Sequence, residues 1–358
     1  MPTSFADTVA PRRPLRVGMF LRHPRPGFFS LETVFSTVRE ALPEGVDARL
    51  YVSPYPSRGV LNRLKSIAAA RRRMREDGLD VAHVLGDEHF LTLGLPRART
   101  VLTVADSNAI ADARGLRRAI LWLIWLYLPL RASRVVTAIS ERSKAQLADL
   151  TGPRATAVRV IDCPLPARFG PMGPPPDSRT VLHIGTKANK NLDRLVAAMQ
   201  GLDARLIVVG RLSGAQQALL DGSGVAYENR VNLSDAEMLE AYRDCTIMTF
   251  VSTAEGFGMP IIEAQAIGRP VLTSDLSPMR EVAGGAAALV DPTDTGRVRA
   301  GLVRLLEDAG HREDLVRRGR ENARRFAAGR IAGQYADLYR EVAGKAAHEI
   351  PAPGRAEA

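Results

Sequence analysis

The chain has 358 residues, of which 46% are hydrophobic and 25% are charged, and its formal net charge is +10. This length favours two domains, and the composition is that of an ordinary soluble globular protein. The two cysteines, Cys163 and Cys245, offer neither a metal-binding spacing nor a disulfide framework, so a reducing cytoplasm is expected. No aromatic ladder or nucleic-acid module accompanies the positive charge, which argues against a nucleic-acid partner and leaves an anionic substrate or a membrane surface open.

Short β-rich runs alternate with helix-length segments from Arg16 to Val290, a pattern typical of parallel sheets covered by helices on both faces. In the first half, strands are expected at Val17–Leu21, Arg49–Val52, Val81–Leu85, Thr100–Val104, Val135–Ala138 and Val158–Ile161. Helices are expected between them at Leu31–Leu42, Leu61–Glu76 and Glu141–Asp149. Residues 1–162 are therefore predicted to form a first doubly wound, Rossmann-like domain.

The longest apolar run, Ala119–Leu130, has 12 residues, fewer than the roughly 20 that a membrane-spanning helix needs. It contains Trp122 and Trp125 and is flanked by arginines, so it could lie on a membrane interface. Its apolar residues occupy all faces of a helix, however, and this favours a buried helix over a membrane-surface helix.

Residues 163–178 contain six prolines and two glycines, a composition that interrupts helices and central strands and predicts an interdomain linker. A second series of strands is expected at Thr180–Ile184, Arg205–Val209, Ile247–Val251, Val271–Ser274 and Ala287–Val290. Residues 179–328 are assigned to a second doubly wound domain. Residues 329–350 are assigned to a C-terminal helix that is a candidate to return to the first domain.

The stretch from Glu255 to Glu263 is the most informative part of the chain. It joins the strand that ends at Val251 to a helix predicted to begin at Pro260, where a missing N–H costs nothing. Flexible glycines before a helix start form an anion site, because free N–H groups and the helix dipole point at the bound group. Two carboxylates beside such a site suit a phosphate ester that carries hydroxyl-rich sugars on both sides. The pattern therefore predicts a nucleotide sugar as the ligand.

The same nine residues resemble the Glu-x7-Glu signature of retaining glycosyltransferases of family four. Three further segments resemble that family: His183–Leu192 its first donor-domain loop, Asn232–Arg243 the loop and helix before the signature strand, and Ala138–Lys144 a strand-to-helix segment near the cleft. The resemblance implies a GT-B fold, in which two Rossmann-like domains face each other across a cleft. It also implies a retaining hexosyltransferase of glycan biosynthesis. No cofactor is expected, and no essential metal is expected either, because no Asp-x-Asp motif lies at a strand end and Lys190 and a helix terminus are available for the phosphates. The implied donor is a UDP-, GDP- or other nucleotide sugar, and the implied acceptor is a hydroxyl of a glycan, a lipid-linked molecule or a small natural product.

By this resemblance, Glu255 and Lys190 are the catalytic candidates. Glu255 would bind hydroxyls of the donor sugar near the reacting carbon, Lys190 would stabilise the charge that develops on the leaving diphosphate, and Glu263 would accept hydrogen bonds from the ribose. A solvated loop position is the alternative role for Glu255 and Lys190, and compensation of the helix dipole is the alternative for Glu263. Gly27 and Asp106 are the acceptor-side candidates. The full set of donor-binding candidates is Gly185, Thr186, Lys187, Lys190, Glu255, Gly256, Phe257, Gly258 and Glu263.

The chain departs from the family pattern at two places. Relatives usually place an arginine just after the first donor-domain glycine, where this chain has Thr186 and Lys187, and an ammonium does not reproduce the bidentate contacts of a guanidinium. The family often carries Thr-Ile-His-Asp at the end of a first-domain strand, where this chain has Thr-Val-Ala105-Asp106. Alanine cannot hydrogen-bond the sugar. Either another group fills that place, or the chain is a catalytically weak or silent relative that binds nucleotide sugars or supports a partner enzyme.

Other assignments stay open at this point. A sugar-nucleotide epimerase or a phosphorylase of the same fold is a rival enzyme, whereas a nicotinamide oxidoreductase is disfavoured because no Gly-x-Gly-x-x-Gly follows an early strand. His83 and His183 lie within strand-like runs and are expected to be structural.

Overall fold

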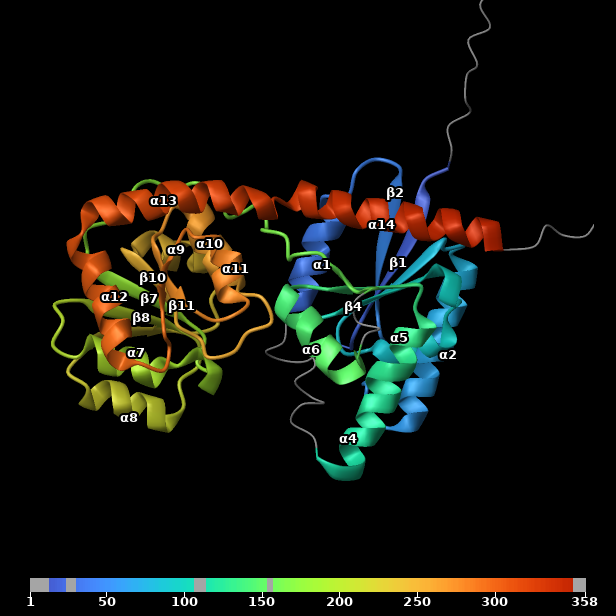
Figure 1. Cartoon of the computed structure of the whole chain (residues 1–358), viewed down its shortest axis with the longest axis horizontal. Helices are drawn as coiled ribbons and strands as arrows, with labels where there is room; N and C mark the ends of the chain where they lie inside the picture. Colours follow the sequence, from blue (N-terminus) through green and yellow to red (C-terminus); the bar gives the residue numbers. More distant parts are fainter. Residues whose placement is uncertain (1–12, 24–29, 106–113, 153–156, 350–358) are drawn as a thin grey trace, which may run out of the picture.

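The computed structural model describes residues 13–23, 30–105, 114–152 and 157–349, and these residues form two six-stranded sheets (Figure 1). Neighbouring strands are parallel in both sheets. Each sheet has helices on both faces, so its strands are apolar on both sides and form the core of a lobe. The prediction of two doubly wound α/β domains is confirmed.

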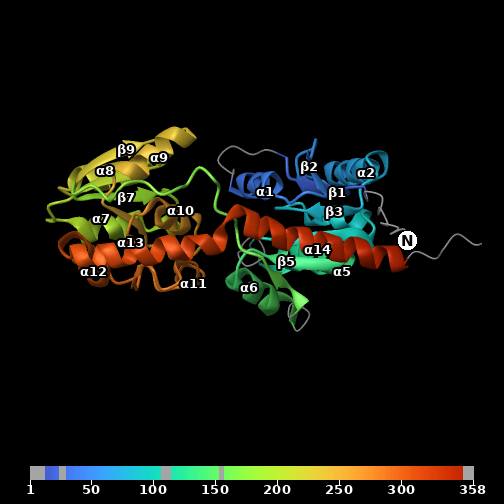
Figure 2. The same cartoon turned by 90° about the horizontal axis from the view of Figure 1, so that it is seen from above.

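The first sheet has the strand order β2-β1-β3-β4-β5-β6. Its strands are β1 (Leu15–Leu21), β2 (Val46–Val52), β3 (Val81–Val84), β4 (Thr100–Val104), β5 (Val135–Ala138) and β6 (Arg159–Val160). Helices α1 (Ser30–Glu40) and α2 (Val60–Glu76) lie on one side of this sheet in Figure 2, and α6 (Glu141–Thr151) lies on the other. After β1 the chain adds β2 on one side of it and then β3 to β6 on the other side. The direction of winding therefore reverses between β1 and β3.

The second sheet has the order β12-β11-β10-β7-β8-β9, and its winding reverses between β7 and β10. Its strands are β7 (Thr180–Ile184), β8 (Arg205–Val209), β9 (Ala226–Arg230), β10 (Ile247–Phe250), β11 (Val271–Ser274) and β12 (Ala288–Val290). Its helices are α7 (Leu192–Met199), α8 (Gly214–Gly222), α9 (Asp235–Asp244), α10 (Met259–Ile267), α11 (Met279–Ala283), α12 (Thr295–Glu307) and α13 (Ala309–Ala323). Ser234 and Glu237 form a capping box at the start of α9, in which the side chain of each residue accepts a hydrogen bond from the backbone N–H of the other.

One strand escaped the sequence analysis. Strand β9 reads Ala-Tyr-Glu-Asn-Arg and lies at the edge of the second sheet, paired on one side only with β8. None of its residues is fully buried, so it lacks the apolar run by which the other strands were predicted.

The last helix, α14 (Ala328–Glu349), runs from the second lobe across the first, as Figure 1 shows. Its Tyr339 hydroxyl lies 2.8 Å from Nδ1 of His83 in β3, and Glu341 forms a bidentate ion pair with Arg159 of β6. The proline-rich segment 163–178 crosses back along the second lobe, where the N–H of Met172 donates to the carbonyl of Ile267. Helix and segment together connect the two lobes.

The expectation of a buried helix at Ala119–Leu130 is wrong. The segment forms α4 (Gly115–Leu121), the π-helix η3 (Trp122–Tyr127) and α5 (Leu128–Ala132), and only Leu126 and Pro129 are buried within it. Leu116 is 77% exposed and Ile120 is 48% exposed. Apolar residues on every face of a helix show that no face is strongly polar. They do not show that other parts of the protein pack against every face, and here most of the faces are left partly exposed. None of the helices in the described part of the chain is long and apolar enough to cross a membrane.

Candidate functional site

The second sheet carries the candidate site at its winding reversal. Ligands of doubly wound sheets bind at the carboxyl ends of strands where the winding reverses, and here those strands are β7 and β10. The loop after β7 holds Gly185 and Lys190, and the loop after β10 holds Glu255. The two loops are hydrogen-bonded to each other: the N–H of Thr253 donates to the carbonyl of Asn189, whose side-chain amide donates to the carbonyl of Ala254.

Lys190 and Glu255 form an ion pair in which Nζ lies 2.7 Å from Oε1. Their side chains are 18% and 14% exposed, so the pair is largely shielded from solvent. The ammonium also lies 4.4 Å from the ring centroid of Phe250, and the amide of Asn189 donates to the same carboxylate oxygen. The two residues predicted to be catalytic are therefore brought together, and neither is a solvated loop side chain.

Gly185 has a backbone φ of +95°, a conformation that favours glycine. A Cβ at this position would lie 3.0 Å from Cγ and Cε of Lys190. The glycine thus does two things: it turns the chain after β7, and it leaves room for the lysine side chain to lie across the loop toward Glu255.

Helix α10 begins beside this ion pair. Gly258 precedes it with φ of +116°, Pro260 lies in its first turn, and no side chain of the described residues caps it. Pro260 has no N–H and the N–H of Ile261 donates to the carbonyl of Gly258, so the N–H of Met259 and those of the glycine loop before it are the donors available to an anion, with the positive end of the helix dipole behind them. The ring of Phe257 is 4% exposed and packs edge-to-face on Phe326, so only the backbone of Phe257 faces the site.

Glu263 lies one turn into α10 and is half-buried. Its Oε2 accepts a hydrogen bond of 2.7 Å from the hydroxyl of Tyr242 in α9. Burial raises the pKa of Glu263, whereas the hydrogen bond from Tyr242 and the charge of Arg168 act to lower it.

The remaining donor-side candidates lie at the rim. Thr186 donates its hydroxyl to the carbonyl of Arg211, and Lys187 is exposed. Arg211 follows Gly210 at the end of β8, and a Cβ on Gly210 would lie 3.1 Å from Thr186. Arg211 was not predicted to lie beside the donor-side loop. A glycine followed by an arginine directly after a strand was the signal that could have indicated it.

The two lobes touch at the glycine loop. The hydroxyl of Ser140, at the start of α6, donates to the carbonyl of Gly256 at 2.7 Å. A Cβ on Gly256 would lie 3.5 Å from the carbonyl oxygen of Ala105, which itself accepts from Ser143. Ala105, at the position of the family histidine, therefore borders the loop between Glu255 and α10. The acceptor-side candidates Gly27 and Asp106 lie outside the described residues.

A cluster of charged side chains around the buried Arg22 marks the corresponding reversal in the first sheet. Arg22 follows β1, is 6% exposed, and pairs with Glu32 of α1 and with Asp87 after β3. Sequence reasoning missed this cluster because its members are far apart in the chain. The available signal was a charged residue within three positions of the end of each of two strands.

Both strand histidines are structural, as expected. His83 is fully buried between Tyr339 and Thr103, and burial lowers its pKa to about 3. His183 is 1% exposed, neither ring nitrogen has a hydrogen-bond partner among the described residues, and burial lowers its pKa to about 4.

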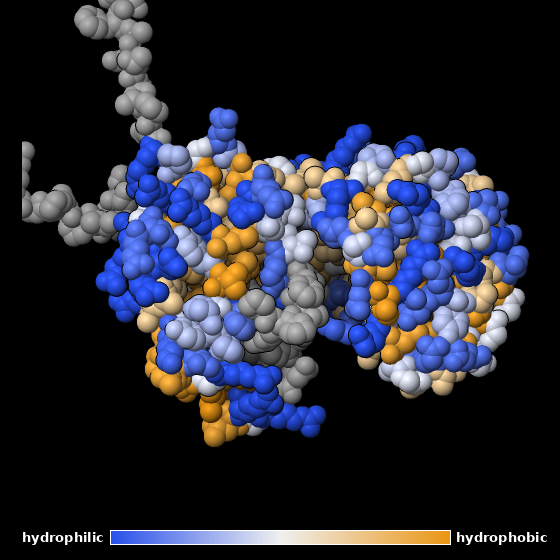
Figure 3. Space-filling model, turned by 180° about the vertical axis from the view of Figure 1, so that it is seen from behind, coloured by the Kyte–Doolittle hydropathy of each residue, from blue (hydrophilic) through white to orange (hydrophobic). Residues whose placement is uncertain are grey.

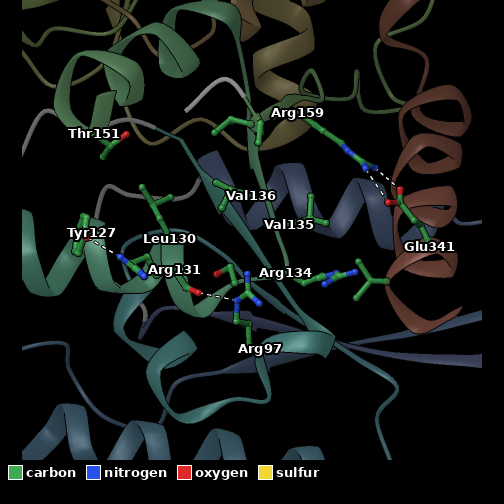
Figure 4. A pocket seen from close by; sticks show the side chains of 14 residues that line it. Arg97, Tyr127, Leu130, Arg131, Arg134, Val135, Val136, Thr151, Arg159 and Glu341 are labelled. Atoms are coloured by element: carbon green, nitrogen blue, oxygen red, sulfur yellow. Dashed lines mark hydrogen bonds and ion pairs between the residues drawn. The ribbon is translucent and has the colours of Figure 1, made fainter. Parts of the chain in front are cut away.

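In the part of the chain that the structure describes, no three His, Cys, Asp or Glu side chains are grouped so that they could hold a metal ion. A cavity of about 880 Å³ opens at the amino ends of β5 and β6, between α5 and α14 (Figure 4). The cavity lies at the amino ends of the strands, whereas the charge cluster around Arg22 lies at their carboxyl ends. Two of its arginines already have partners: Arg159 forms an ion pair with Glu341, and Arg97 donates a hydrogen bond to the carbonyl of Arg131.

Residues 178–308 match the family model described as Glycosyl transferases group 1. A phosphatidyl-myo-inositol mannosyltransferase of Mycobacterium leprae is 28% identical over 327 residues, which cover 85% of this chain and 85% of that protein. Its counterpart in Mycolicibacterium smegmatis is 31% identical over 48% of this chain and 47% of its own length. The O-antigen chain mannosyltransferase B of Escherichia coli is 31% identical over 30% of this chain and 28% of its own length. Several of these matches thus span about half of the relative or less.

Solved structures share the fold. Anabaena Alr3699/HepE in complex with UDP and glucose superposes with a TM-score of 0.72 at 17% identity, covering 91% of this chain and 100% of that one. WaaG, a glycosyltransferase involved in lipopolysaccharide biosynthesis, superposes with a TM-score of 0.65 at 15% identity, covering 90% and 99%. At these identities the likeness concerns the arrangement of the two lobes.

Proposed function

Because residues 178–308 match the group 1 glycosyltransferases and the described chain has the GT-B fold, we propose that this protein transfers a hexosyl residue from a nucleotide sugar to an acceptor hydroxyl, with retention of the anomeric configuration. The observation that carries the proposal is the shielded pair of Lys190 and Glu255 beside the uncapped start of α10. An anion site flanked by one cation and one carboxylate matches a diphosphate that is esterified to a sugar.

The proposed reaction assigns separate tasks to these groups. The diphosphate of the donor lies at the amino end of α10 and the glycine loop before it, and Lys190 turns from Glu255 toward it as the donor enters. Glu255 then accepts hydrogen bonds from hydroxyls of the donor sugar. When the bond between the anomeric carbon and the β-phosphate oxygen breaks, its electron pair goes to the diphosphate, where Lys190 and the helix terminus stabilise the new charge.

The acceptor oxygen attacks the anomeric carbon from the face that the diphosphate leaves. The new glycosidic bond forms there, and the proton of the acceptor hydroxyl passes to the departing diphosphate. This route needs no separate general base. On the first lobe, the charge cluster of Arg22, Glu32 and Asp87 is our candidate for contacts with the acceptor, because it lies at the winding reversal of that sheet.

Kinetics of two variants test the assignment. Glu255→Ala is expected to abolish transfer even at saturating donor, whereas Glu263→Ala is expected to raise the KM for the donor and to leave most of kcat. Thermal-shift measurements with a panel of nucleotide sugars identify the donor for this assay. A wild-type rate in Glu255→Ala under donor saturation, together with an unchanged KM for the donor in Glu263→Ala, would refute the site.

A silent nucleotide-sugar-binding protein is the second candidate, and the position of Ala105 favours it. This residue borders the loop after Glu255, where a hydrogen-bonding side chain would reach the sugar, and its methyl group cannot do so. Tight binding of a nucleotide sugar, without hydrolysis and without transfer to any acceptor, would support this alternative over the enzyme.

We further propose that the acceptor is presented at an anionic membrane surface. A face of the first lobe, here called the α2–α4 face, exposes six apolar side chains that are between 42% and 77% accessible: Val60, Leu61, Leu64, Leu116, Ile120 and Leu123. Arg63 of α2 lies 5.1 Å from the ring centroid of Trp125 in η3, so the two helical segments lie against each other. Segments 58–75 and 114–140 contain no acidic residue and several arginines. Figure 3 shows hydrophobic and hydrophilic residues side by side at the lower tip of this lobe.

This composition is that of a surface that lies in the headgroup region of a bilayer, with apolar side chains inserted and arginines among the phosphates. Helix α4 is also the next helix after β4 in the described part of the chain, and Ala105, the residue that follows β4, borders the site. A lipid or lipid-linked acceptor is consistent with the name of the Mycobacterium leprae relative.

A further inference from the structure

A fully buried tyrosine of the second lobe holds one of the two carboxylates. Tyr242 of α9 has no exposed surface, and its hydroxyl donates to Oε2 of Glu263 at 2.7 Å. The tyrosine is itself fixed on two sides. Its ring packs edge-to-face on Phe169 of the segment between the lobes, with centroids 5.9 Å apart, and its carbonyl accepts from the buried guanidinium of Arg269 at 2.8 Å.

Only one of the two carboxylate oxygens of Glu263 accepts a hydrogen bond from the described residues. A carboxylate has two oxygens, and Tyr242 takes only Oε2. Oε1 accepts no hydrogen bond from the part of the chain that the structure describes, and the residue keeps some exposure at the first turns of α10. A single bond from a rigid donor fixes the rotation of the carboxylate, so the free oxygen has a defined direction.

We propose that Tyr242 is a positioning residue for the donor: its hydroxyl holds Glu263 so that the free carboxylate oxygen accepts the ribose hydroxyls of the nucleotide. This inference rests on the proposed function, because it assumes that a nucleotide binds at α10. Tyr242 does not touch the donor and takes no part in bond breaking. It acts through the orientation and the ionisation of Glu263.

The charges around Glu263 support this role. Burial raises its pKa, and Asp235 at the start of α9 acts in the same direction. Two groups act against burial: the hydroxyl of Tyr242, and Arg168 of the segment between the lobes. Arg168 is held over the ring of Phe169 at 4.9 Å and lies 3.4 Å from Asp235. The protonated form of Glu263 would offer the ribose a poorer acceptor, so these two groups keep the carboxylate in its binding form.

The sign of the pH effect follows from these directions. The pKa of Glu263 in the folded protein is raised above its ordinary value, and the hydrogen bond from Tyr242 limits that rise. Removal of the hydroxyl therefore raises the pKa further. As the pH falls, affinity for the nucleotide is lost at a higher pH in the Tyr242→Phe variant than in the wild type.

The test compares Tyr242→Phe with Tyr339→Phe by calorimetric titration of uridine and guanosine diphosphates. Tyr339 is a matched control, because it is also fully buried and its hydroxyl also makes one hydrogen bond, to His83 in the first lobe. At neutral pH we expect Tyr242→Phe to weaken binding about five- to tenfold, the typical effect of one lost hydrogen bond, and Tyr339→Phe to leave it unchanged. Both variants are expected to lose similar thermal stability.

A pH series separates positioning from a merely structural role. Titrations between about pH 8 and about pH 5 should show the loss of affinity shifted to higher pH in Tyr242→Phe alone. In a double-mutant cycle, Tyr242→Phe should cause no further loss when Glu263→Ala is already present. An unshifted pH profile, or full additivity in the cycle, overturns the inference while the proposed function stands. If the wild type binds neither of these two diphosphates nor adenosine or thymidine diphosphate, the proposed function itself fails.

Discussion

The ammonium of Lys190 lies 2.7 Å from the carboxylate of Glu255, and both side chains are less than one-fifth exposed. In the proposed reaction each of these residues faces the donor, yet in this structure the charge of each is neutralised by the other. A diphosphate that enters the site offers Lys190 a more highly charged partner, and it releases Glu255 toward the sugar. The pair therefore keeps both charges compensated in a shielded site until the substrate replaces the contact.

Replacement of Lys190 tests the role of the cation. Lys190→Ala is expected to lower kcat by about 100- to 1000-fold, because the departing diphosphate loses a fixed positive charge and Glu255 is left unpaired. Steady-state kinetics at saturating donor measure the effect. Lys144→Ala is the control, since Lys144 forms an ion pair with Glu141 on the surface of the first lobe. An equal loss in both variants would show that the effect is not specific to the site.

A methyl group at Gly185 is expected to displace Lys190 without removing it. Gly185→Ala should destabilise the fold by about 1 kcal/mol, because φ is +95° there, and should also lower turnover, because its Cβ would lie 3.0 Å from the lysine side chain. Gly201→Ala separates the two effects. Gly201 also has a positive φ, of +69°, but a Cβ would meet nothing within 4 Å.

Urea denaturation and transfer assays on these two glycine variants measure the difference. Similar losses of unfolding free energy, with reduced turnover only in Gly185→Ala, are expected. Normal turnover in Gly185→Ala would mean that the position of Lys190 across the loop has no catalytic importance.

Sedimentation with lipid vesicles tests the α2–α4 face. The wild type should bind vesicles that contain anionic phospholipid, bind neutral vesicles weakly, and dissociate as salt is raised. Leu116→Asp should reduce binding several-fold, because it places a negative charge at the most exposed apolar position of the face. Leu219→Asp, at an exposed position of α8 on the second lobe, should bind as the wild type does. Equal binding by all three proteins would exclude this face as the contact.

Acidification is expected to destabilise the protein through its buried histidines. The pKa values of His83 and His183 are lowered to about 3 and about 4, so both are neutral when folded and take up protons only on unfolding. Their contribution to the free energy of unfolding is complete above the ordinary histidine pKa of about 6.5. It declines as the pH falls from there toward the pKa values that the two histidines have in the folded protein. Each histidine should contribute a slope of up to about 1.4 kcal/mol per pH unit in that window.

Chemical denaturation at several pH values between about 6 and about 4.5 measures this slope. His83→Gln should lower stability at neutral pH, because it disturbs the contacts with Tyr339 and Thr103, and it should reduce the slope by about one histidine's share. An unchanged slope would show that His83 is not buried as a neutral group.

Much of the fold follows from local patterns. The strand from Ile247, the glycine loop and the helix after Pro260 are visible in the sequence because an apolar run, a turn signal and a helix start occur in order, and the observed bounds differ by about one residue. Strand β9 lacks such a pattern, since an edge strand needs no apolar residues. The exposure of Leu116 and Ile120 was also beyond reach, because periodicity reports the character of a helix face and not what covers it.

The candidate site divides in the same way. Glu255, Lys190 and Gly185 could be proposed because each lies at a strand end or in a recognisable loop. The contact of Tyr242 with Glu263 and the cluster around Arg22 could not, since they join residues on different elements whose relative placement depends on the packed sheet. Local signals indicate which residues are available to a site, and the partners that orient them come from tertiary structure.

A crystal structure of the protein with a bound nucleoside diphosphate would show whether the anion lies at this site. We expect the diphosphate at the amino end of α10 and the glycine loop before it, with Nζ of Lys190 within hydrogen-bond distance of a phosphate oxygen and moved away from Glu255. A diphosphate bound elsewhere, with Lys190 still 2.7 Å from Glu255, would contradict this expectation.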